Sequence, residues 1–566
     1  MVLYLPAVLF LLLVPIMSEG VELPRSIGVI LFSLGYLVLQ SRVFQVKRKI
    51  YYLPFLLPIT YLVSAIANQQ NLFEALFGGY KRNFGILTFF GMGIIFLAAF
   101  NLNLNNSNKF YKITLLPVSI LSIIYAFVQI AKKDFLLWGE QDRVVLSIGN
   151  SNFAASYIAL LLPTMLYGFA ISKSRLYKAL NLVLLALLFY SGLRTMSFQF
   201  NVVALVSITA FMFITFFHFF ARRKFSFKIL STTGLFAITI YTITKYKTVL
   251  NEFTNADDRL SQQRAGLEIF RDNFLFGVGV DNLYKYMPLY SRPEDIQREG
   301  IDIVPDKTHN VFIDHFANGG VFVGISYLLF ILSIFYYIYK ILSAGPKFNI
   351  DLALPASIFI GYVCQLVINT DSILNMLIPY ISMGMIARFY LNTVSKQTTT
   401  LNLGRKNQSL SIFGVALIIF IIPLCIRIIS TDIEVRNIMN SKYKDGDRVI
   451  EILNMWPYPK PTEQVMIKYI QDVNNCPFVD RVATRLSEVD SRSSQALFVK
   501  SICADAYGDQ IAALTYVKKA IDLQPMNVRY LHAKFQLEKA LGYESDSLNT
   551  KNLVDSILGV SGTTDQ

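Results

Sequence analysis

The sequence predicts an all-α membrane protein: a polytopic bundle of about 12 to 13 transmembrane helices with a large external loop and a C-terminal helical domain. Two observations carry this prediction. Hydrophobic residues make up 54% of the chain and charged residues only 16%, a composition unlike that of a soluble enzyme. Apolar stretches of nearly membrane-spanning length also recur along most of the chain, separated mainly by short polar segments.

Thirteen apolar stretches are long enough, or nearly so, to cross a hydrocarbon core about 30 Å thick as helices. They cover residues 2–17, 26–42, 51–67, 84–101, 112–131, 152–172, 178–193, 197–221, 227–245, 319–340, 352–369, 373–391 and 410–429. The first stretch lacks the basic start and small-residue cleavage site of a signal peptide, so we expect it to remain as a span.

The basic residues predict the orientation of these spans. Loops after the even-numbered stretches are rich in Lys and Arg, for example Arg222, Arg223 and Lys224, whereas the intervening short loops carry few, such as Arg25. The positive-inside rule places the basic loops and the N-terminus in the cytoplasm. It also accounts for much of the formal charge of +14 without a nucleic-acid partner. The two long polar segments are then expected on the outer face.

The chain is expected to have three regions. They are a membrane domain at 1–429 with its external loop at about 246–318, a helical extracytoplasmic domain at 430–556, and a disordered tail at 557–566. Residues 495–541 resemble one tetratricopeptide unit, because Ala513, Ala520 and Pro525 stand at its spacing. One unit cannot bury its face alone, so neighbouring helices are expected before it; the alternative is a generic helical bundle.

The external loop carries the most distinctive motifs. It reads RLSQQRAGLEIFRDNFLFGVGVDNLYKYMP and then THNVFIDHFANGGVFVGISYLLF as it enters the span at 319–340. Two further motifs precede it, LFGGYKRNFGILTF from Leu76 and GNSNFAASYIALLLP at 149–163. Together, over about residues 72–391, these motifs resemble the O-antigen ligase and O-antigen polymerase superfamily.

The resemblance implies a membrane glycosyltransferase with a GT-C-like helical fold, acting at the outer face of a bacterial inner membrane. The implied donor is a polyprenyl-diphosphate-linked glycan, and the implied acceptor is a hydroxyl of a lipid, a glycan or a protein. The family implies no cofactor and no metal, and the Cys and His residues of this chain form no C-x-x-C or H-x-x-x-H pair. The helical tail is expected to recognise a bulky acceptor or a protein partner.

A diphosphate leaving group needs cations that hold its growing charge, and arginine binds phosphate oxygens in pairs while remaining charged. By resemblance the catalytic arginines are Arg194, between spans seven and eight, and Arg264, in the external loop. The segment SGLRTMSF departs from the family pattern, because Leu193 separates the serine from Arg194. Arg82 is a further phosphate-binding candidate. For each, the alternative is an ordinary interfacial or solvated charge.

The acceptor hydroxyl needs a base, and histidine titrates near neutral pH. His309 fills the family's H-N position and is expected to act as base or to orient the acceptor. His315 lies six residues on and is a weaker substrate-binding candidate. Asn310 either contacts substrate or caps the following helix. Asp281 and Asn282, after the G-x-G turn, are candidate glycan contacts.

The function we predict is a ligase that moves a glycan from its lipid carrier to an acceptor, such as the lipid A core of lipopolysaccharide in the cell envelope. Three alternatives stay open: an O-antigen or exopolysaccharide repeat-unit polymerase, a protein O-oligosaccharyltransferase, and a non-enzymatic lipid-glycan transporter. A transporter often has internal repeats with interrupted helices in both halves, and the sequence shows neither.

Overall fold

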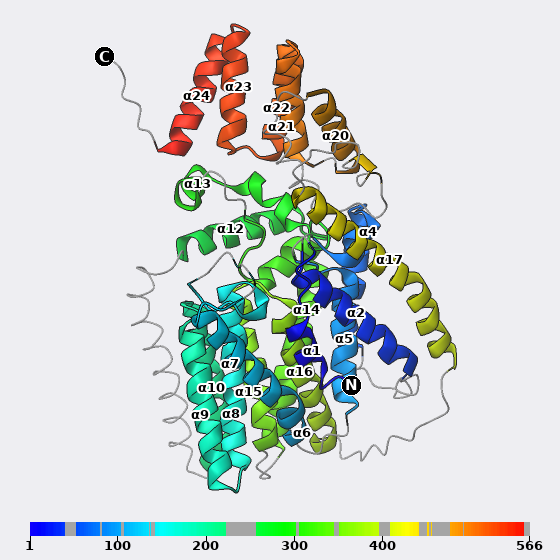
Figure 1. Ribbon diagram of the computed structural model, residues 1–566, viewed down its shortest axis with the longest axis vertical. Helices are drawn as coiled ribbons and strands as arrows, with labels where there is room; N and C mark the ends of the chain where they lie inside the picture. The colour runs from blue at the N-terminus through cyan, green and yellow to red at the C-terminus, as the bar shows by residue number, and fades with distance from the viewer. Residues whose placement is uncertain are drawn as a thin grey trace.

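The computed structural model describes residues 1–17, 19–39, 52–79, 82–102, 107–134, 136, 138, 142–221, 256–300, 305–344, 350–394, 408–440, 450–451, 454, 476–490 and 492–559. Within these ranges every regular element is a helix and no strand occurs. Figure 1 shows a tall bundle of helices with a smaller group of helices at one end. The predicted all-α class is confirmed.

Nine of the described helical segments are long and apolar enough to cross a membrane. They are α2 (Glu22–Leu39), α6–α7 (Asn108–Ile130), α8 (Ser151–Ile171), α9 (Arg175–Leu193), α10 (Phe198–Ala221), α14 (Val311–Ser343), α15 (Ile350–Ile368), α16 (Ile373–Val394) and α17 (Gln408–Asn440). Two shorter apolar helices, α3 (Leu53–Ala67) and α5 (Ile86–Phe100), lie among them. The polytopic membrane class predicted from composition is therefore confirmed.

The first predicted span differs from the structure. Helix α1 covers only Leu5–Leu11, because Leu12 is extended, with φ −78° and ψ 97°. The chain then turns back, and the amide of Val14 donates to the carbonyl of Gly20 at 3.0 Å. A helix of this length cannot cross the hydrocarbon core. The predicted span at 227–245 lies outside the described residues.

Helix α16 forms the centre of the bundle. It packs against α5, α14 and α15, and almost all of it is buried. At Gly384 an added Cβ would lie 2.3 Å from the carbonyl oxygen of Phe96, so the backbones of α16 and α5 approach closely. Small residues at such a crossing let van der Waals packing join helices in lipid, where the hydrophobic effect gives little help.

Helix α14 is broken where it meets the external loop. Gly320 has φ 72°, so the helical geometry is interrupted there. The break leaves carbonyl groups free for the G-x-G turn: the amides of Val278 and Gly279 donate to Ala317 and Asn318 at 3.1 and 2.8 Å. A Cβ at Gly320 would lie 2.2 Å from the carbonyl oxygen of Leu275. Gly320 thus leaves room for the loop, whereas the G-x-x-x-G spacing of Gly320 and Gly324 would by itself indicate packing against another span.

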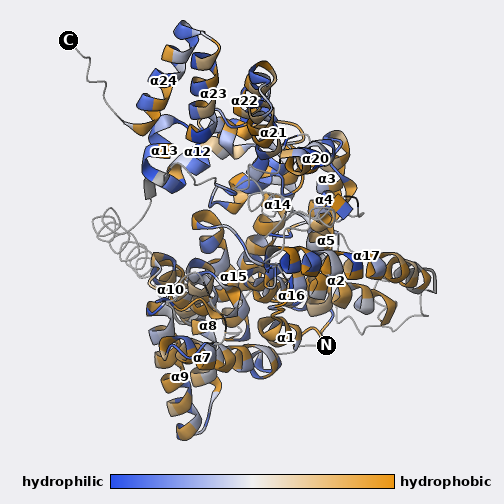
Figure 2. Cartoon of the chain, turned by 45° about the horizontal axis from the view of Figure 1, so that its top comes forward, coloured by the Kyte–Doolittle hydropathy of each residue, from blue (hydrophilic) through white to orange (hydrophobic). Residues whose placement is uncertain are grey.

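The C-terminal helices lie at the end of the bundle that carries α12 (Ala256–Asp272) and α13 (Pro293–Glu299), as Figures 1 and 2 show. They are α20 (Cys476–Val489), α21 (Ser494–Ala506), α22 (Gln510–Leu523), α23 (Val528–Ala540) and α24 (Glu544–Leu558). Each packs against the next. The tetratricopeptide identity of this array stays a prediction, and most of the predicted disordered tail lies outside the described residues.

Direct contacts join this array to the external loop. Lys285 forms ion pairs with Glu74 of α4 (Leu72–Phe77) at 3.3 Å and with Asp490 at 3.1 Å. The Arg492 guanidinium lies 4.1 Å from the ring centre of Tyr286. The array is therefore anchored on the loop that carries the candidate site.

Candidate functional site

Three sequence motifs that lie far apart in the chain converge at the loop end of the bundle. Arg82, of the early motif, pairs with Asp306 through Nε–Oδ2 at 2.8 Å and Nη2–Oδ1 at 3.2 Å. The Arg82 guanidinium also lies 5.5 Å from the ring centre of Phe153, which belongs to GNSNF. Asp306 stands three residues before His309. The fold thus brings the three motifs to one place.

The loop around His309 is fixed on both sides. The amide and hydroxyl of Thr308 each donate to Asp314 Oδ1 at 2.9 Å. Asn310 caps α14, its side chain accepting hydrogen bonds from the amides of Phe312 and Ile313 at 3.1 and 3.3 Å. Between the two alternatives for Asn310, the structure shows the helix cap.

Backbone strain gathers at this end of the molecule. Non-glycine residues rarely adopt positive φ, and such positions persist only where the surroundings enforce them, often at functional sites. The described positions with positive φ include Asn83, Met196, Asp281 and His309, at φ 58°, 52°, 52° and 53°. Each of the four is a predicted site residue or lies within two residues of one.

His309 is held by an amide and faces cations. Its Nδ1 lies 3.2 Å from Asn369 Oδ1. When Nδ1 donates to this oxygen, Nε2 carries the free lone pair that a base requires. Burial and the nearby charge of Arg259 lower the pKa of His309 to about 4. The imidazole is therefore neutral at physiological pH and keeps a lone pair on one ring nitrogen.

Arg259 is a cation that the sequence motifs did not single out. It donates to the carbonyl of Ile368 at 3.1 Å, and burial lowers its pKa. The Gln199 side-chain amide lies 2.7 Å from Asn369 and, in the orientation that satisfies its neighbours, 3.2 Å from Arg259 Nη2. Arg259 and His309 thus share a buried network of amide groups. The only sequence signal for Arg259 is its place at the head of RLSQQR.

Arg264 lies elsewhere on the same helix. It pairs with Glu268 at 3.2 Å and with Asp295 at 2.6 Å, and it donates to the carbonyl of Tyr290 at 3.3 Å. These contacts clamp α13 against α12. Two carboxylates already neutralise its guanidinium, so the structure gives Arg264 a different setting from Arg82 and Arg259.

Arg194 ends α9, and its carbonyl accepts a hydrogen bond from the amide of Val144 at 3.0 Å. Its Nε is buried and has no hydrogen-bond partner among the described residues. The turn that follows is tied to GNSNF, because Ser197 Oγ donates to Asn152 Oδ1 at 2.7 Å. A buried unpaired donor on a cation is costly, so Arg194 is suited to receive an anionic ligand.

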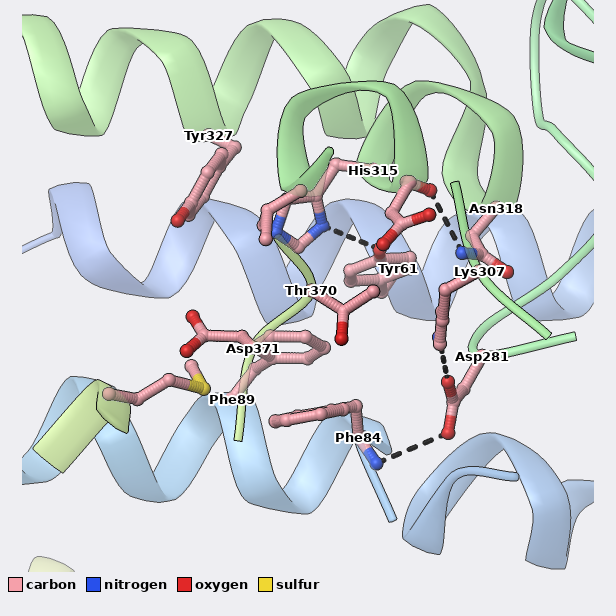
Figure 3. Close-up of a pocket in the computed structure, with 13 residues that line it drawn as sticks. Tyr61, Phe84, Phe89, Asp281, Lys307, His315, Asn318, Tyr327, Thr370 and Asp371 are labelled. Atoms are coloured by element: carbon pink, nitrogen blue, oxygen red, sulfur yellow. Dashed lines mark hydrogen bonds and ion pairs between the residues drawn. The ribbon is translucent and has the colours of Figure 1, made fainter. Parts of the chain in front are cut away.

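A pocket with an empty volume of about 460 Å³ opens beside the His309 loop (Figure 3). Four aromatic residues line one part of it: Tyr61, Phe84, Phe89 and Tyr327. His315 also lines it, and His315 Nδ1 lies 2.7 Å from the Tyr61 hydroxyl. His315 therefore faces the pocket, while Asn282 donates from its side chain to the carbonyl of Val278 at 3.1 Å.

The charged wall of the pocket holds two groups that the sequence did not single out. Lys307 forms a buried ion pair with Asp281. Asp371 accepts a hydrogen bond from the Tyr362 hydroxyl at 2.5 Å, and burial raises the pKa of Asp371 to about 7. Lys307 precedes the H-N pair by two residues, and Asp371 lies two residues after Asn369. No group of three His, Cys, Asp or Glu side chains suited to a metal occurs in the described part of the chain.

No curated protein matches this chain. A family model described as O-antigen ligase matches residues 164–328. That range contains Arg194, Arg259, Arg264 and His309, whereas Arg82 and Asp371 lie outside it. The match over residues 164–328 supports the resemblance to the O-antigen ligase and polymerase superfamily that the motifs indicate.

Proposed function

We propose that this protein transfers a glycan from a polyprenyl-diphosphate carrier to an acceptor hydroxyl at the outer face of the inner membrane, as an O-antigen ligase does. The family match supports a membrane glycosyltransferase. The observation that carries the finer proposal is the setting of His309: a neutral imidazole, held by Asn369, with the charges of Arg259 and Arg82 close enough to lower its pKa.

The proposed reaction is a direct displacement. The acceptor oxygen forms a bond to the anomeric carbon of the donor, and the bond from that carbon to the phosphate oxygen breaks. His309 Nε2 takes the hydroxyl proton, and the diphosphate leaves with the electron pair of the broken bond. A general base of this kind contributes about 10²- to 10⁴-fold to a rate.

The arginines hold the charge that develops on the leaving group. Arg82 shares its fork with Asp306, and Arg259 makes one backbone contact, so both retain N–H donors for phosphate oxygens. The buried Nε of Arg194 offers another. In a site of low dielectric constant such preorganised donors stabilise a growing anion more strongly than water does.

The outer-face location rests on the arrangement of loops. The candidate site, α12, α13 and the C-terminal helices share one end of the bundle in Figure 1. Lys173 and Arg175, which follow α8, and Lys340, in the last turn of α14, belong to the other end. Under the positive-inside rule that other end is cytoplasmic. A donor used at the outer face must arrive already activated, and a polyprenyl-diphosphate glycan meets this requirement.

The position of the C-terminal helices favours a ligase over a polymerase. They sit on the loop of the candidate site, where Lys285 and Arg492 anchor them. An array in this place is suited to bind a bulky acceptor, whether lipid, glycan or protein. A polymerase remains the second candidate, because the same site would extend a lipid-linked chain.

Surface-glycan analysis of a deletion strain tests the proposal. The strain is complemented with wild type, His309→Ala, Arg82→Ala or Arg259→Ala, with the exposed Arg271→Ala as control. A ligase predicts long glycan on the lipid carrier and no mature conjugate for all variants except the control. Conjugates that carry single repeats would instead indicate a polymerase. Normal glycans in the three site variants would refute the proposed function.

A further inference from the structure

We propose that Asp281 is a positioning residue whose single carboxylate holds together the loop that carries Arg82 and the loop that carries His309. This inference rests on the proposed function, because it concerns the same site. The sequence suggested Asp281 as a glycan contact, but its two oxygens have internal partners from both loops. Figure 3 shows the carboxylate between Lys307 and the amide of Phe84.

One oxygen of Asp281 binds the Arg82 loop. Oδ2 accepts hydrogen bonds from the amides of Gly79 at 2.5 Å and Phe84 at 3.3 Å. These two amides bracket the turn on which Arg82 stands. The turn closes on itself as well, because the amide of Asn83 donates to the carbonyl of Gly79 at 2.9 Å. A Cβ at Gly79 would lie 2.8 Å from the backbone oxygen of Asp281, so the close approach requires glycine there.

The other oxygen binds the His309 loop. Oδ1 forms the ion pair with Lys307, which precedes His309 by two residues. Lys307 also follows Asp306, the partner of Arg82. The contacts therefore form a closed ring that runs from Asp281 to the Arg82 turn, across the Arg82–Asp306 pair, and back through Lys307.

The ring of contacts is buried, and the backbone next to Asp281 is held in place. Only 1% of the Asp281 side chain and 8% of the Lys307 side chain are exposed. Gln70 holds the residue before Asp281 by a pair of hydrogen bonds to the amide and carbonyl of Val280, each 2.8 Å. Burial alone would lower the pKa of Lys307, but the nearby Asp281 and Asp314 raise it, so the Lys307 ammonium stays charged.

Only a carboxylate can accept hydrogen bonds from all the partners of Asp281. Two backbone amides and an ammonium are all donors, and an ionised Asp has acceptor lone pairs on both oxygens. An Asn would turn its own donors toward one of these partners and leave a buried group unsatisfied. The geometry of Arg82 relative to His309 depends on this residue, and a displacement of about 1 Å at a reacting centre lowers rates by up to about 10²-fold.

The test compares Asp281→Ala, Arg82→Ala and the double variant in the full-length protein in detergent. Initial transfer rates are measured with polyprenyl-diphosphate-linked glycan extracted from the deletion strain and with acceptor extract at fixed concentration. Asp281→Ala is expected to raise the donor KM and to lower kcat, by about 10- to 100-fold in kcat/KM. The double variant is expected to lose less than the product of the two single losses, because Asp281 acts in part through Arg82.

The matched control is Asp351→Ala. Asp351 holds a backbone amide in the same way, accepting from Ser107 at 3.0 Å and from the Tyr167 hydroxyl at 2.5 Å, near α6 at the other end of the bundle. It is expected to lower the melting temperature without raising the donor KM. Equal kinetic losses in the Asp281 and Asp351 variants, or independent losses in the double variant, would overturn the inference.

A second variant keeps the test open if Asp281→Ala does not fold. Lys307→Gln removes the ion pair that joins Asp281 to the His309 loop and leaves both amide contacts of Asp281. It is therefore expected to lower kcat more than it raises the donor KM. An unchanged kcat would overturn the inference. If His309→Ala and Arg82→Ala also transfer glycan normally, the proposed function itself fails; if they are inactive while the Asp281 and Lys307 variants are normal, only the positioning role fails.

Discussion

Arg82 and Asp306 form a two-point ion pair that joins the early loop of the chain to the external loop, 224 residues later. Burial would raise the pKa of Asp306, but Arg82 and the neighbouring Lys307 lower it to about 2. The pair is therefore charged at any physiological pH. The ion pair fixes the orientation of the Arg82 guanidinium and leaves its remaining N–H donors for a ligand.

Arg82→Lys tests whether the fork geometry matters. Lysine keeps the charge but cannot bind two oxygens in a plane. We expect transfer to fall by about 10²- to 10³-fold, as when one preorganised donor is removed from an active site. Initial rates with extracted donor measure this. Asp306→Asn, which keeps the Arg82 charge, should retain more activity than Arg82→Lys; the reverse order would refute the assignment.

The pH dependence follows from the low pKa of His309. Its pKa in the folded protein is about 4, below the ordinary value of 6.5, so the folded state disfavours the proton. The base is then neutral above about pH 5, and the rate should change little between pH 6 and 8. The contribution of His309 to the free energy of unfolding should be lost as the pH falls from 6.5 through 4. Rate and melting profiles of wild type and His309→Gln check both statements, with His532→Gln in the tail as control. A rate that falls with a midpoint near 6.5 would contradict the buried setting.

Comparing Arg259→Ala with Arg271→Ala distinguishes the effect of a buried charge from that of an exposed charge on the same helix, α12. Arg259 belongs to the amide network near His309, whereas 76% of the Arg271 side chain is exposed. We expect the donor KM to rise only for Arg259→Ala. Equal effects would mean that α12 acts by its overall charge.

Arg264→Ala tests the clamp between α12 and α13. The change leaves Glu268 and Asp295 without this cation, and we expect the unfolding free energy to fall by about 1–3 kcal/mol. Limited proteolysis should detect faster cleavage near α13. If the variant instead keeps its stability and loses all transfer, Arg264 contacts the diphosphate directly, as the family resemblance first suggested.

Gly320→Ala should disrupt the junction of α14 and the external loop. Its φ of 72° and the 2.2 Å approach of the Leu275 carbonyl leave no room for a Cβ. Gly35→Ala in α2 is the matched control, because nothing lies within 4 Å of its Cβ position. Melting temperatures in detergent should fall for Gly320→Ala and hold or rise slightly for Gly35→Ala. Equal values would show that the break is not required.

Most of the membrane helices were predictable because a run of about 20 apolar residues has few alternatives to a span. Helix α1 was not, since its early end depends on the extended Leu12 and the return of the chain to Gly20. The break at Gly320 was missed for a similar reason. G-x-x-x-G is a common helix-packing pattern. The loop that packs against Gly320 lies more than 40 residues earlier in the chain, so the local sequence does not indicate this contact.

Part of the site was also predictable. The motifs identified Arg82 and His309, and the fold brings their loops together through Asp306 and Lys307. The family resemblance singled out Arg264 and not Arg259, although both lie in one polar helix. Five residues turn a helix by about 140° relative to its start, so the two arginines face different partners. Which charges are buried is decided by tertiary contacts, and these also placed Lys307 and Asp371 in the pocket wall.

Release of free polyprenyl diphosphate by the purified protein, measured by mass spectrometry, tests whether His309 acts as the base of glycan transfer. The donor is the lipid-linked glycan extracted from the deletion strain, and wild type, His309→Gln and Asp351→Ala are compared with and without acceptor extract. We expect acceptor-dependent release by wild type and by Asp351→Ala, and a loss of about 10²- to 10⁴-fold in His309→Gln. Equal release by wild type and His309→Gln would contradict this role of His309.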